Sequence, residues 1–344
     1  NSIKKFITNL INSFISLTII NMFATLAVAT LAASASASLS SASPESHKMM
    51  FESFKSQHGR RYKTQDEENA SFKTFVSNLA LIDERNSAER KAGGSAMHAV
   101  TKFADVSHED FMARLNLKPS NETKKFMTVP AASSTSADWT GVYTTPVKNQ
   151  GYCGSCWAFA ASEQIESDSM RLLGTNYILA PEQMVECDKT SMGCNGGLQE
   201  RAYSYVKRAG GQEQESDYPY TSGVDGSTSS CSSDSSKYVL TVADYANING
   251  ETDMANYVLA TGPVSIDVDA STWSTYTGGI MSTCPTQINH AVQAVGVDTS
   301  SNGYWKVRNS WGEDWGESGF IRLSYGSDTC GLTYDVSVVT PAKV

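Results

Sequence analysis

Seven cysteines constrain this chain most, because their number is odd. They stand at positions 153, 156, 187, 194, 231, 284 and 330, all in the C-terminal two-thirds of the 344 residues. Six of them can pair as disulfides, and one is left over. In an oxidising compartment a leftover cysteine is either an intermolecular bridge or a free, reactive thiol. The odd cysteine therefore points to chemistry before any motif is considered.

The N-terminus indicates the compartment. Lys4 and Lys5 precede an apolar run without charges from about Phe14 to Ala33, which closes on small Ala and Ser residues. This order of basic, apolar and small residues predicts a secretory signal peptide over residues 1–38. The alternative is a membrane-spanning helix, since the run is nearly long enough to cross a bilayer. We favour the signal peptide because no basic flank follows the run.

Composition excludes one class of partner. The chain carries a formal net charge of −9 and has a pI near 5.1. Phosphate backbones require a basic surface, so nucleic acid is not an expected partner. Its 40% hydrophobic and 18% charged residues are typical of a globular protein with a sizeable core.

The order of secondary-structure patterns predicts an α+β protein. Aromatic residues at helical intervals predict amphipathic helices between His47 and Ile82, and a second helical piece is predicted at Ser107–Leu115 with Ser107 as its N-cap. A strong helix is predicted directly after Cys156. Helices first and strands later imply two lobes rather than alternating βαβ units. Further helices are expected at 181–186 and 198–208, and strands at 238–243, 264–268, 291–297, 304–308 and 320–323.

The segment from Gln150 to Trp157, which reads QGYCGSCW, carries the chemistry. Cysteine attacks as the thiolate, which is favoured at a helix N-terminus or beside an imidazolium. Cys156 lies at the predicted start of a helix, whose dipole lowers the pKa of a thiol there. His290 follows Cys156 by 134 residues and Asn309 follows it by 153.

This motif and spacing resemble the papain and cathepsin family of cysteine proteases. The resemblance extends to Pro146–Gln150 before the nucleophile and to Gly193–Gly197, which is similar to the family's substrate-binding strand. It also covers Asn289–Val292 around the histidine and Asn309–Gly312 around the asparagine. The four motifs stand in the family's order and span most of residues 139–344. The resemblance implies a papain-like two-lobe fold, with a helical left lobe, a β-barrel-like right lobe and a cleft between them.

The resemblance also implies a role for each catalytic residue. Cys156 is expected to attack the scissile carbonyl, and His290 to hold an ion pair with it and to protonate the leaving amine. Asn309 is expected to orient the imidazole. Gln150 and the backbone N–H of Cys156 are expected to form the oxyanion hole, where one donor is worth about 3–4 kcal/mol.

Substrate contacts follow from the same alignment. It places two carboxylates, Asp267 and Asp335, in the pocket for the residue two positions before the cut bond. We therefore hypothesise that this pocket accepts Arg or Lys as well as hydrophobic groups. The alternative is that one or both carboxylates face solvent, or that the alignment slips by one residue. The full set of expected substrate-binding residues is Gly196, Gly197, Leu198, Gln199, Asp267, Ile288, Ala291, Trp311, Trp315 and Asp335.

The family pattern pairs Cys153 with Cys194, Cys187 with Cys231, and Cys284 with Cys330, leaving Cys156 free. Two other interpretations of the cysteines are weaker. A thioredoxin-like Cys153–Cys156 redox pair would need a βαβ context, and a zinc site would need a second closely spaced pair. No metal and no cofactor are expected.

The N-terminal region resembles an inhibitory propeptide. The family's interrupted helix pattern matches at every position except Ser71, which replaces an arginine, and Phe103-Ala104-Asp105 matches a second propeptide motif. We expect the propeptide at residues 39–132 and the mature peptidase at 133–344. The residues that match the helix pattern are Glu67, Phe75, Asn78, Ile82 and Asn86.

These features predict a cysteine endopeptidase that is made as an autoinhibited zymogen. Expected partners are protein and peptide substrates, the chain's own propeptide and cystatin-like inhibitors. We expect a monomer in the secretory pathway, lysosomal, vacuolar or extracellular, with no membrane association once the signal is removed. Asn69-Ala70-Ser71 and Asn121-Glu122-Thr123 are glycosylation sequons. The competing classes are a catalytically dead homologue that binds or stores, and a disulfide-stapled interaction protein.

Overall fold

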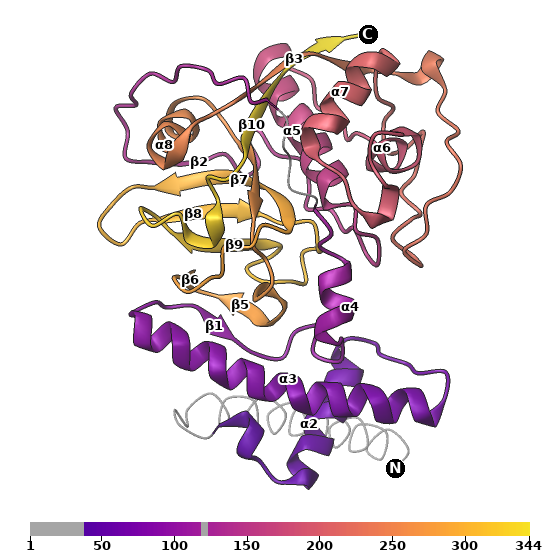
Figure 1. Ribbon diagram of the computed structural model, residues 1–344, viewed down its shortest axis with the longest axis vertical. Coiled ribbons are helices and arrows are strands. Elements are labelled where there is room, and N and C mark those ends of the chain that lie inside the picture. Colours follow the sequence, from indigo (N-terminus) through magenta and orange to yellow (C-terminus); the bar gives the residue numbers. More distant parts are fainter. Residues whose placement is uncertain (1–37, 118–122) are drawn as a thin grey trace, which may run out of the picture.

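The computed structural model describes residues 38–117 and 123–344, so the predicted signal segment lies almost entirely outside the described residues. Figure 1 shows a helical lobe and a sheet lobe side by side, with an N-terminal helical unit lying across one end of both. The two-lobe α+β arrangement predicted from the sequence is confirmed. Within the described residues, no helix is both long and apolar enough to cross a membrane.

The N-terminal helical unit comprises α2 (Pro44–Gln57), α3 (Gln65–Ala92), β1 (Met97–His98) and α4 (His108–Ala113), after a short 3-10 turn at Leu39–Ser41. Thr64 caps the start of α3, because its side chain accepts a hydrogen bond from the backbone N–H of Glu67. Ser107 caps α4 in the same way, as the sequence predicted. The aromatic positions of the predicted amphipathic pattern form a core of their own. Its buried members are Phe51, Phe54, Phe75, Leu79, Ile82 and Ala104.

Two asparagines of the propeptide-like helix pattern tie α3 to the chain that follows it. The Asn78 amide donates to the carbonyls of Ala104 and Val106, at 2.9 and 3.0 Å. Asn86 donates to the carbonyl of His98 and accepts from its N–H, at 2.8 and 2.9 Å. The pattern therefore marks the positions where one long helix fixes an otherwise extended segment.

The helical lobe contains α5 (Cys156–Leu173), α6 (Pro181–Cys187) and α7 (Gln199–Ala209). Helix α5 is buried along most of its length, which suits a central helix that contacts both lobes. One expectation was wrong: Gly193–Asn195, placed in a substrate-binding strand, forms a 3-10 turn. The turn needs Gly193 at a φ of 57°, a left-handed conformation that a glycine adopts without strain.

The sheet lobe is built on one eight-stranded sheet in the order β3-β10-β4-β7-β8-β9-β6, with β2 paired to β7. This is the expected β-rich right lobe, and within the described residues no pairing joins β6 back to β3. Helix α8 (Gly250–Ala260) was not predicted, because its apolar residues follow no clear helical stripe. The strands are β2 (Ser136–Asp138), β3 (Leu240–Asn247), β4 (Val264–Val268), β5 (Tyr276–Gly278), β6 (Ile280–Met281), β7 (His290–Asp298), β8 (Tyr304–Arg308), β9 (Phe320–Ser324) and β10 (Val336–Lys343), with 3-10 turns at Ser235–Lys237, Trp273–Thr275 and Thr329–Gly331.

Three disulfides hold loops of the two lobes. They join Cys153 to Cys194, Cys187 to Cys231 and Cys284 to Cys330, the three pairs that the resemblance implied. The remaining cysteine, Cys156, is free and buried.

The N-terminal helical unit docks on the sheet lobe through α3 and β1. Strand β1 pairs with β5, Met97 opposite Gly278 and His98 opposite Tyr276. One turn from the end of α3, the buried Glu89 carboxylate accepts the backbone N–H groups of Ser282 and Thr283, at 3.1 and 2.7 Å. These donors have no other hydrogen-bond partner in the interface, so this carboxylate is a principal polar anchor of the dock.

We predict that Glu89→Ala loosens the docked unit. The change removes the partner of the part-buried Ser282 and Thr283 donors, which costs about 1 kcal/mol, the low end of the range for buried groups. Urea unfolding of the full-length chain, in a Cys156→Ala background that prevents cleavage, measures the loss. Glu84→Ala, an exposed glutamate on the same helix, is the control and should change nothing. Equal unfolding midpoints for the two variants would contradict the anchoring role of Glu89.

Candidate active site

Cys156 is the first residue of α5, where the helix N-terminus presents unpaired backbone N–H groups. Its thiol is fully buried. Trp157 follows it, and its indole fills the space that a side chain at Gly197 would need: a Cβ there would lie 2.5 Å from the ring. The motif therefore sets the start of the helix, and the large residue after the cysteine locks that turn against the 193–197 loop.

His290 is the first residue of β7, and its Nε2 lies 2.8 Å from Asn309 Oδ1. Asn309 follows the end of the neighbouring strand β8, so the antiparallel register of the two strands brings the pair together. The ring of Trp311 stacks on the imidazole with centroids 5.0 Å apart, and Trp273 meets it edge-on at 6.1 Å. The other ring nitrogen, Nδ1, is buried without a hydrogen-bond partner among the described residues.

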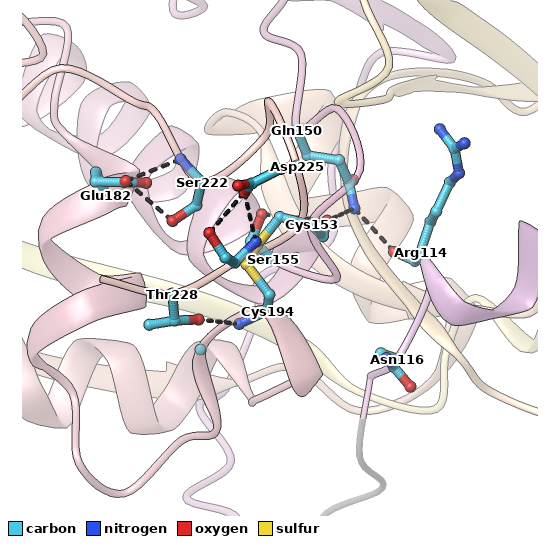
Figure 2. The surroundings of a disulfide bond; sticks show 12 residues. Arg114, Asn116, Gln150, Cys153, Ser155, Glu182, Cys194, Ser222, Asp225 and Thr228 are labelled. Atoms are coloured by element: carbon cyan, nitrogen blue, oxygen red, sulfur yellow. Dashed lines mark hydrogen bonds between the residues drawn. A yellow bond between two sulfur atoms is a disulfide. The ribbon is translucent and has the colours of Figure 1, made fainter. Parts of the chain in front are cut away.

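Gln150 contributes an amide beside the disulfide of Cys153. Its Oε1 accepts a hydrogen bond of 2.6 Å from the Ser310 hydroxyl, which fixes the direction of the amide. The Nε2 group then donates to the carbonyls of Cys153 and Arg114, at 3.0 and 2.9 Å, as Figure 2 shows. The Arg114 carbonyl belongs to the N-terminal part of the chain. The Gln150 amide therefore donates a hydrogen bond to a peptide carbonyl oxygen of the chain's own N-terminal part.

Residues 114–117, the boundary segment, run from α4 between the two lobes. Figure 1 shows α4 leading from the N-terminal helical unit toward the junction of the lobes. The Cys156 thiol lies 3.0 Å from the carbonyl oxygen of Leu115, and the Leu117 N–H donates to the Asn289 carbonyl at 3.0 Å. Leu115 packs in the sheet-lobe core and Leu117 in the helical-lobe core. The segment therefore covers the thiol and joins both lobes.

The register of the boundary segment separates the two donors. The thiol contacts the Leu115 carbonyl, whereas the Gln150 amide contacts the carbonyl of the residue before it, Arg114. Asn116 has a φ of 46°, a left-handed conformation, and its side chain donates to the Ala113 carbonyl at 2.8 Å. Consequently no single peptide group is held by both the thiol and the amide.

Burial under this cover sets the protonation of the two reactive groups. Burial raises the pKa of the Cys156 thiol to about 12, against the smaller opposing effect of backbone N–H groups around it. Burial also lowers the pKa of His290 to about 4, with the Asn309 hydrogen bond opposing it. Burial therefore favours a neutral thiol and a neutral imidazole in the covered pair.

A buried polar network fixes α5 to the strands that carry the histidine and asparagine. Gln293, three residues after His290, donates to the Glu163 carbonyl and to the Ser167 hydroxyl of α5, at 3.2 and 3.0 Å. Arg308, the residue before Asn309, donates to the side-chain Oε1 of Gln293 at 2.7 Å and lies 3.4 Å from the Glu163 carboxylate. Cys156, His290 and Asn309 thus all lie on, or directly after, elements that this one network joins.

Most of the predicted substrate-binding residues lie around this site, but not all lie at its surface. Ala291 is buried next to His290, and Leu198 is buried in the helical-lobe core. Ile288 is part-exposed at the edge of the same core. Trp315 is fully buried and packs against Trp273, Tyr276 and Trp311. It supports Trp311 from behind, and direct contact with a substrate stays a prediction.

The two predicted pocket carboxylates are both buried and close together. The Asp267 N–H donates to the Asp335 carbonyl at 3.1 Å, and the β4–β7 register sets Asp267 opposite Ala291. Sequence reasoning missed two neighbours. Glu200, in the first turn of α7, joins the carboxylates, and Lys124 places its amine 3.2 Å from Asp335. The sequence did offer a signal for Glu200, which stands next to the predicted Gln199. No local signal marked Lys124.

We predict that the thiol of the native full-length chain alkylates slowly. Because burial raises the pKa of Cys156, the reactive thiolate is scarce at pH 8 and increases up to about pH 12. The iodoacetamide rate, followed by intact mass, should rise from pH 7 to 10 without a plateau. The urea-unfolded chain with its disulfides intact is the control, and its rate should level off above the ordinary thiol pKa of about 8.5. A native plateau below pH 7 would show a thiolate already formed under the boundary segment.

The comparisons with known proteins agree with this geometry. Residues 133–340 match the papain family cysteine protease profile, and residues 51–111 match the cathepsin propeptide inhibitor domain. The chain is 34% identical over 325 residues to cysteine proteinase 1 of Dictyostelium discoideum, covering 86% of this chain and 93% of that one. It is also 34% identical over 307 residues to a cysteine proteinase of Trypanosoma brucei brucei, covering 85% and 67%.

A solved structure shares the whole arrangement, including the N-terminal helical unit. The digestive procathepsin L2 proteinase of the Tenebrio molitor larval midgut superposes with a TM-score of 0.78 at 29% identity, covering 86% of this chain and 99% of that one. The match includes both the inhibitor domain and the catalytic domain of a proform. The chain belongs to the papain family of cysteine proteases and carries the family's propeptide inhibitor domain.

Proposed function

We propose that this protease is an endopeptidase in which Cys156 is the nucleophile, His290 carries the proton and Asn309 orients the imidazole. Gln150 supplies one donor of the oxyanion hole. The observation that carries the proposal is the boundary segment itself. A peptide of this same chain lies against the thiol and the Gln150 amide, with contacts of 3.0 and 2.9 Å. A site that holds a peptide carbonyl beside a free thiol supports peptide hydrolysis.

Acylation starts once the boundary segment has left and water has entered. Uncovering reverses the effect of burial, so the thiol proton moves to His290 and an ion pair forms. The Cys156 sulfur attacks the substrate carbonyl carbon, and the carbonyl electron pair moves to oxygen, where Gln150 Nε2 donates to it. The intermediate collapses, the C–N bond breaks, and His290 protonates the leaving amine.

Deacylation uses the same groups in reverse. The neutral His290 takes a proton from water, and the resulting hydroxide attacks the thioester carbonyl. The C–S bond breaks, the acid product leaves, and the sulfur regains its pairing with the imidazolium. Asn309 keeps the Nε2 side of the ring fixed throughout, which leaves Nδ1 for the proton transfers.

The register of the boundary segment gives a reason why it inhibits without being cut. The carbonyl beside the thiol is that of Leu115, and the carbonyl on the Gln150 amide is that of Arg114. Attack at Leu115 would develop negative charge away from the Gln150 donor, and the neutral covered thiol is a poor nucleophile. Both effects slow the reaction at the bound segment.

We further propose that the pocket around Asp267 and Asp335 accepts basic as well as hydrophobic side chains. The support is that both carboxylates are buried and that an amine, that of Lys124, reaches Asp335 in this chain. A guanidinium or ammonium group of a substrate would bring a charge-assisted hydrogen bond to the same oxygen.

The remaining assignments rest on sequence and context. We propose propeptide cleavage near residue 133, where the match to the protease family begins. Three disulfides favour an oxidising compartment, so we propose secretion, or delivery to a lysosome or vacuole. We also propose that the protein is a monomer and that cystatin-like proteins inhibit it. Asn69 is exposed and accessible to glycosylation, whereas Asn121 lies outside the described residues.

We predict that Cys156→Ala abolishes turnover of a Phe-Arg fluorogenic substrate after the propeptide has been removed. Asn309→Ala should lower kcat about 10- to 100-fold with little change in KM, because it removes only the orienting bond of the imidazole. Steady-state kinetics with active sites counted by an epoxide label measures both. If the Cys156→Ala enzyme kept its activity, the class would be wrong and a binding protein would become the better hypothesis.

We predict that Asp335→Asn lowers kcat/KM for an Arg-Arg substrate about 10- to 100-fold, the loss expected for one buried charge-assisted contact. The same change should leave a Phe-Arg substrate nearly unaffected, because an apolar group gains nothing from the charge. Asp244→Asn, an exposed carboxylate, is the matched control. Equal losses on both substrates would mean that Asp335 acts on folding and not on specificity.

A further inference from the structure

Three carboxylates, not two, meet beside the active site. Glu200 comes from the first turn of α7, Asp267 from β4, and Asp335 from the residue before β10. Their exposed fractions are 6%, 0% and 1%. We call these three residues the acidic cluster. Three elements distant in sequence supply it, so the fold and not a local motif brings the charges together.

Neutral amides satisfy only part of the acidic cluster. Gln199 donates to Asp267 Oδ1 at 2.8 Å, and Asn247 donates to Asp335 Oδ1 and Glu200 Oε1 at 2.9 and 3.3 Å. Glu200 Oε2 and Asp267 Oδ2 are buried without a hydrogen-bond partner among the described residues. Burial, and then the charge of Asp335, raise the pKa of both Glu200 and Asp267 well above the usual range. Such a cluster needs a proton or a cation.

Lys124 supplies a cation to this cluster. Its Nζ lies 3.2 Å from Asp335 Oδ2, donates to the Tyr334 carbonyl, and sits 5.1 Å from the centre of the Tyr334 ring. The Lys124 side chain is 27% exposed, against 1% for its carboxylate partner. A long side chain therefore reaches inward from the surface to a buried charge.

The backbone after Lys124 is pinned so that the amine points to the cluster. Residues 124–127, the strap, run along the end of β3. Asn247 accepts from the Lys125 N–H through its side chain at 3.2 Å, and its own N–H donates to the Lys125 carbonyl at 2.8 Å. The Met127 N–H in turn donates to the Asn247 carbonyl at 3.0 Å. Asn247 thus binds the strap with its main chain and its side-chain oxygen, and binds two carboxylates with its side-chain nitrogen.

We propose that Lys124 is an internal stand-in for the basic side chain of a substrate, and that Glu200 is a further residue that sets the specificity of this pocket. The inference rests on the proposed preference for basic side chains. In the zymogen the strap fills the acidic cluster with the chain's own amine, while the boundary segment separately covers the thiol. Removal of the propeptide takes Lys124 away, and a substrate's cation takes its place. The propeptide then inhibits through two independent contacts, one at the thiol and one at the acidic cluster.

The neighbouring residue provides a matched comparison. Lys125 also pairs with a carboxylate, that of Asp244, but the two side chains are 64% and 54% exposed. Exposed pairs of this kind contribute little, because water screens them. If the strap acted only through surface ion pairs, changes at the two lysines would have the same effect.

The experiment follows maturation of six full-length zymogens after transfer to acidic pH, counting active sites with an epoxide label. Lys124→Met should mature about tenfold faster than wild type, the effect of losing one charge-assisted contact. Lys124→Arg should restore the wild-type rate, and Lys125→Met should match wild type. In an Asp335→Asn background, Lys124→Met should have no further effect. Complete labelling of each variant at the end point shows that it folded.

Two results would overturn the inference. One is equal maturation rates for Lys124→Met and Lys125→Met, and the other is a Lys124→Met effect that persists without the Asp335 charge. The mature enzyme, which lacks Lys124, tests the underlying proposal separately. Glu200→Gln in the mature enzyme should lower the Arg-Arg to Phe-Arg ratio of kcat/KM. If mature wild type did not cleave Arg-Arg at all, the proposed function of the pocket would fail whatever the zymogen rates show.

Discussion

The buried network of Glu163, Gln293 and Arg308 is the constraint on which the active site depends. It joins α5, whose first residue is Cys156, to β7, which begins with His290, and to β8, which leads to Asn309. Buried polar groups of this kind are costly unless paired, so each member holds the others in one arrangement. The two lobes can therefore be built from different elements and still present their reactive groups to one another at fixed separation.

Local sequence determined much of the fold and named most of the residues that the candidate site brings together. Helix caps such as Thr64 and Ser107, the aromatic stripe of α3 and the residues around Cys156 depend on near neighbours, and they were predictable. Helix α8 was missed because its apolar residues run all round the helix in sequence, although only one face is buried. Gly193–Asn195 was missed because a left-handed glycine, not apolar alternation, sets its path. Lys124 could not be foreseen from spacing, because its partner is fixed only by the packing of distant elements. Glu200 was marked only by its place next to the predicted Gln199.

Covering the active site changes its chemistry as well as its access. The leucines of the boundary segment exclude water from both reactive groups, which favours the uncharged forms of the thiol and the imidazole. In the inhibition proposed above, the same four residues restrain the site twice, once by occupancy and once by electrostatics. Neither restraint requires distortion of the catalytic residues, whose hydrogen bonds are already in place.

Strand β2 gives this design a kinetic consequence. Ser136–Asp138 pairs with β7, so a cut shortly before it leaves the new end of the peptidase fixed in the sheet. Before the cut, the covalent connection to the peptidase gives the N-terminal helical unit a high effective concentration at the site. After it, the same contacts become bimolecular and depend on how much free fragment is present. Dilution or degradation of the fragment then decides how completely the enzyme becomes active. In a compartment where the fragment stays concentrated, part of the enzyme would remain inhibited after every chain has been cut.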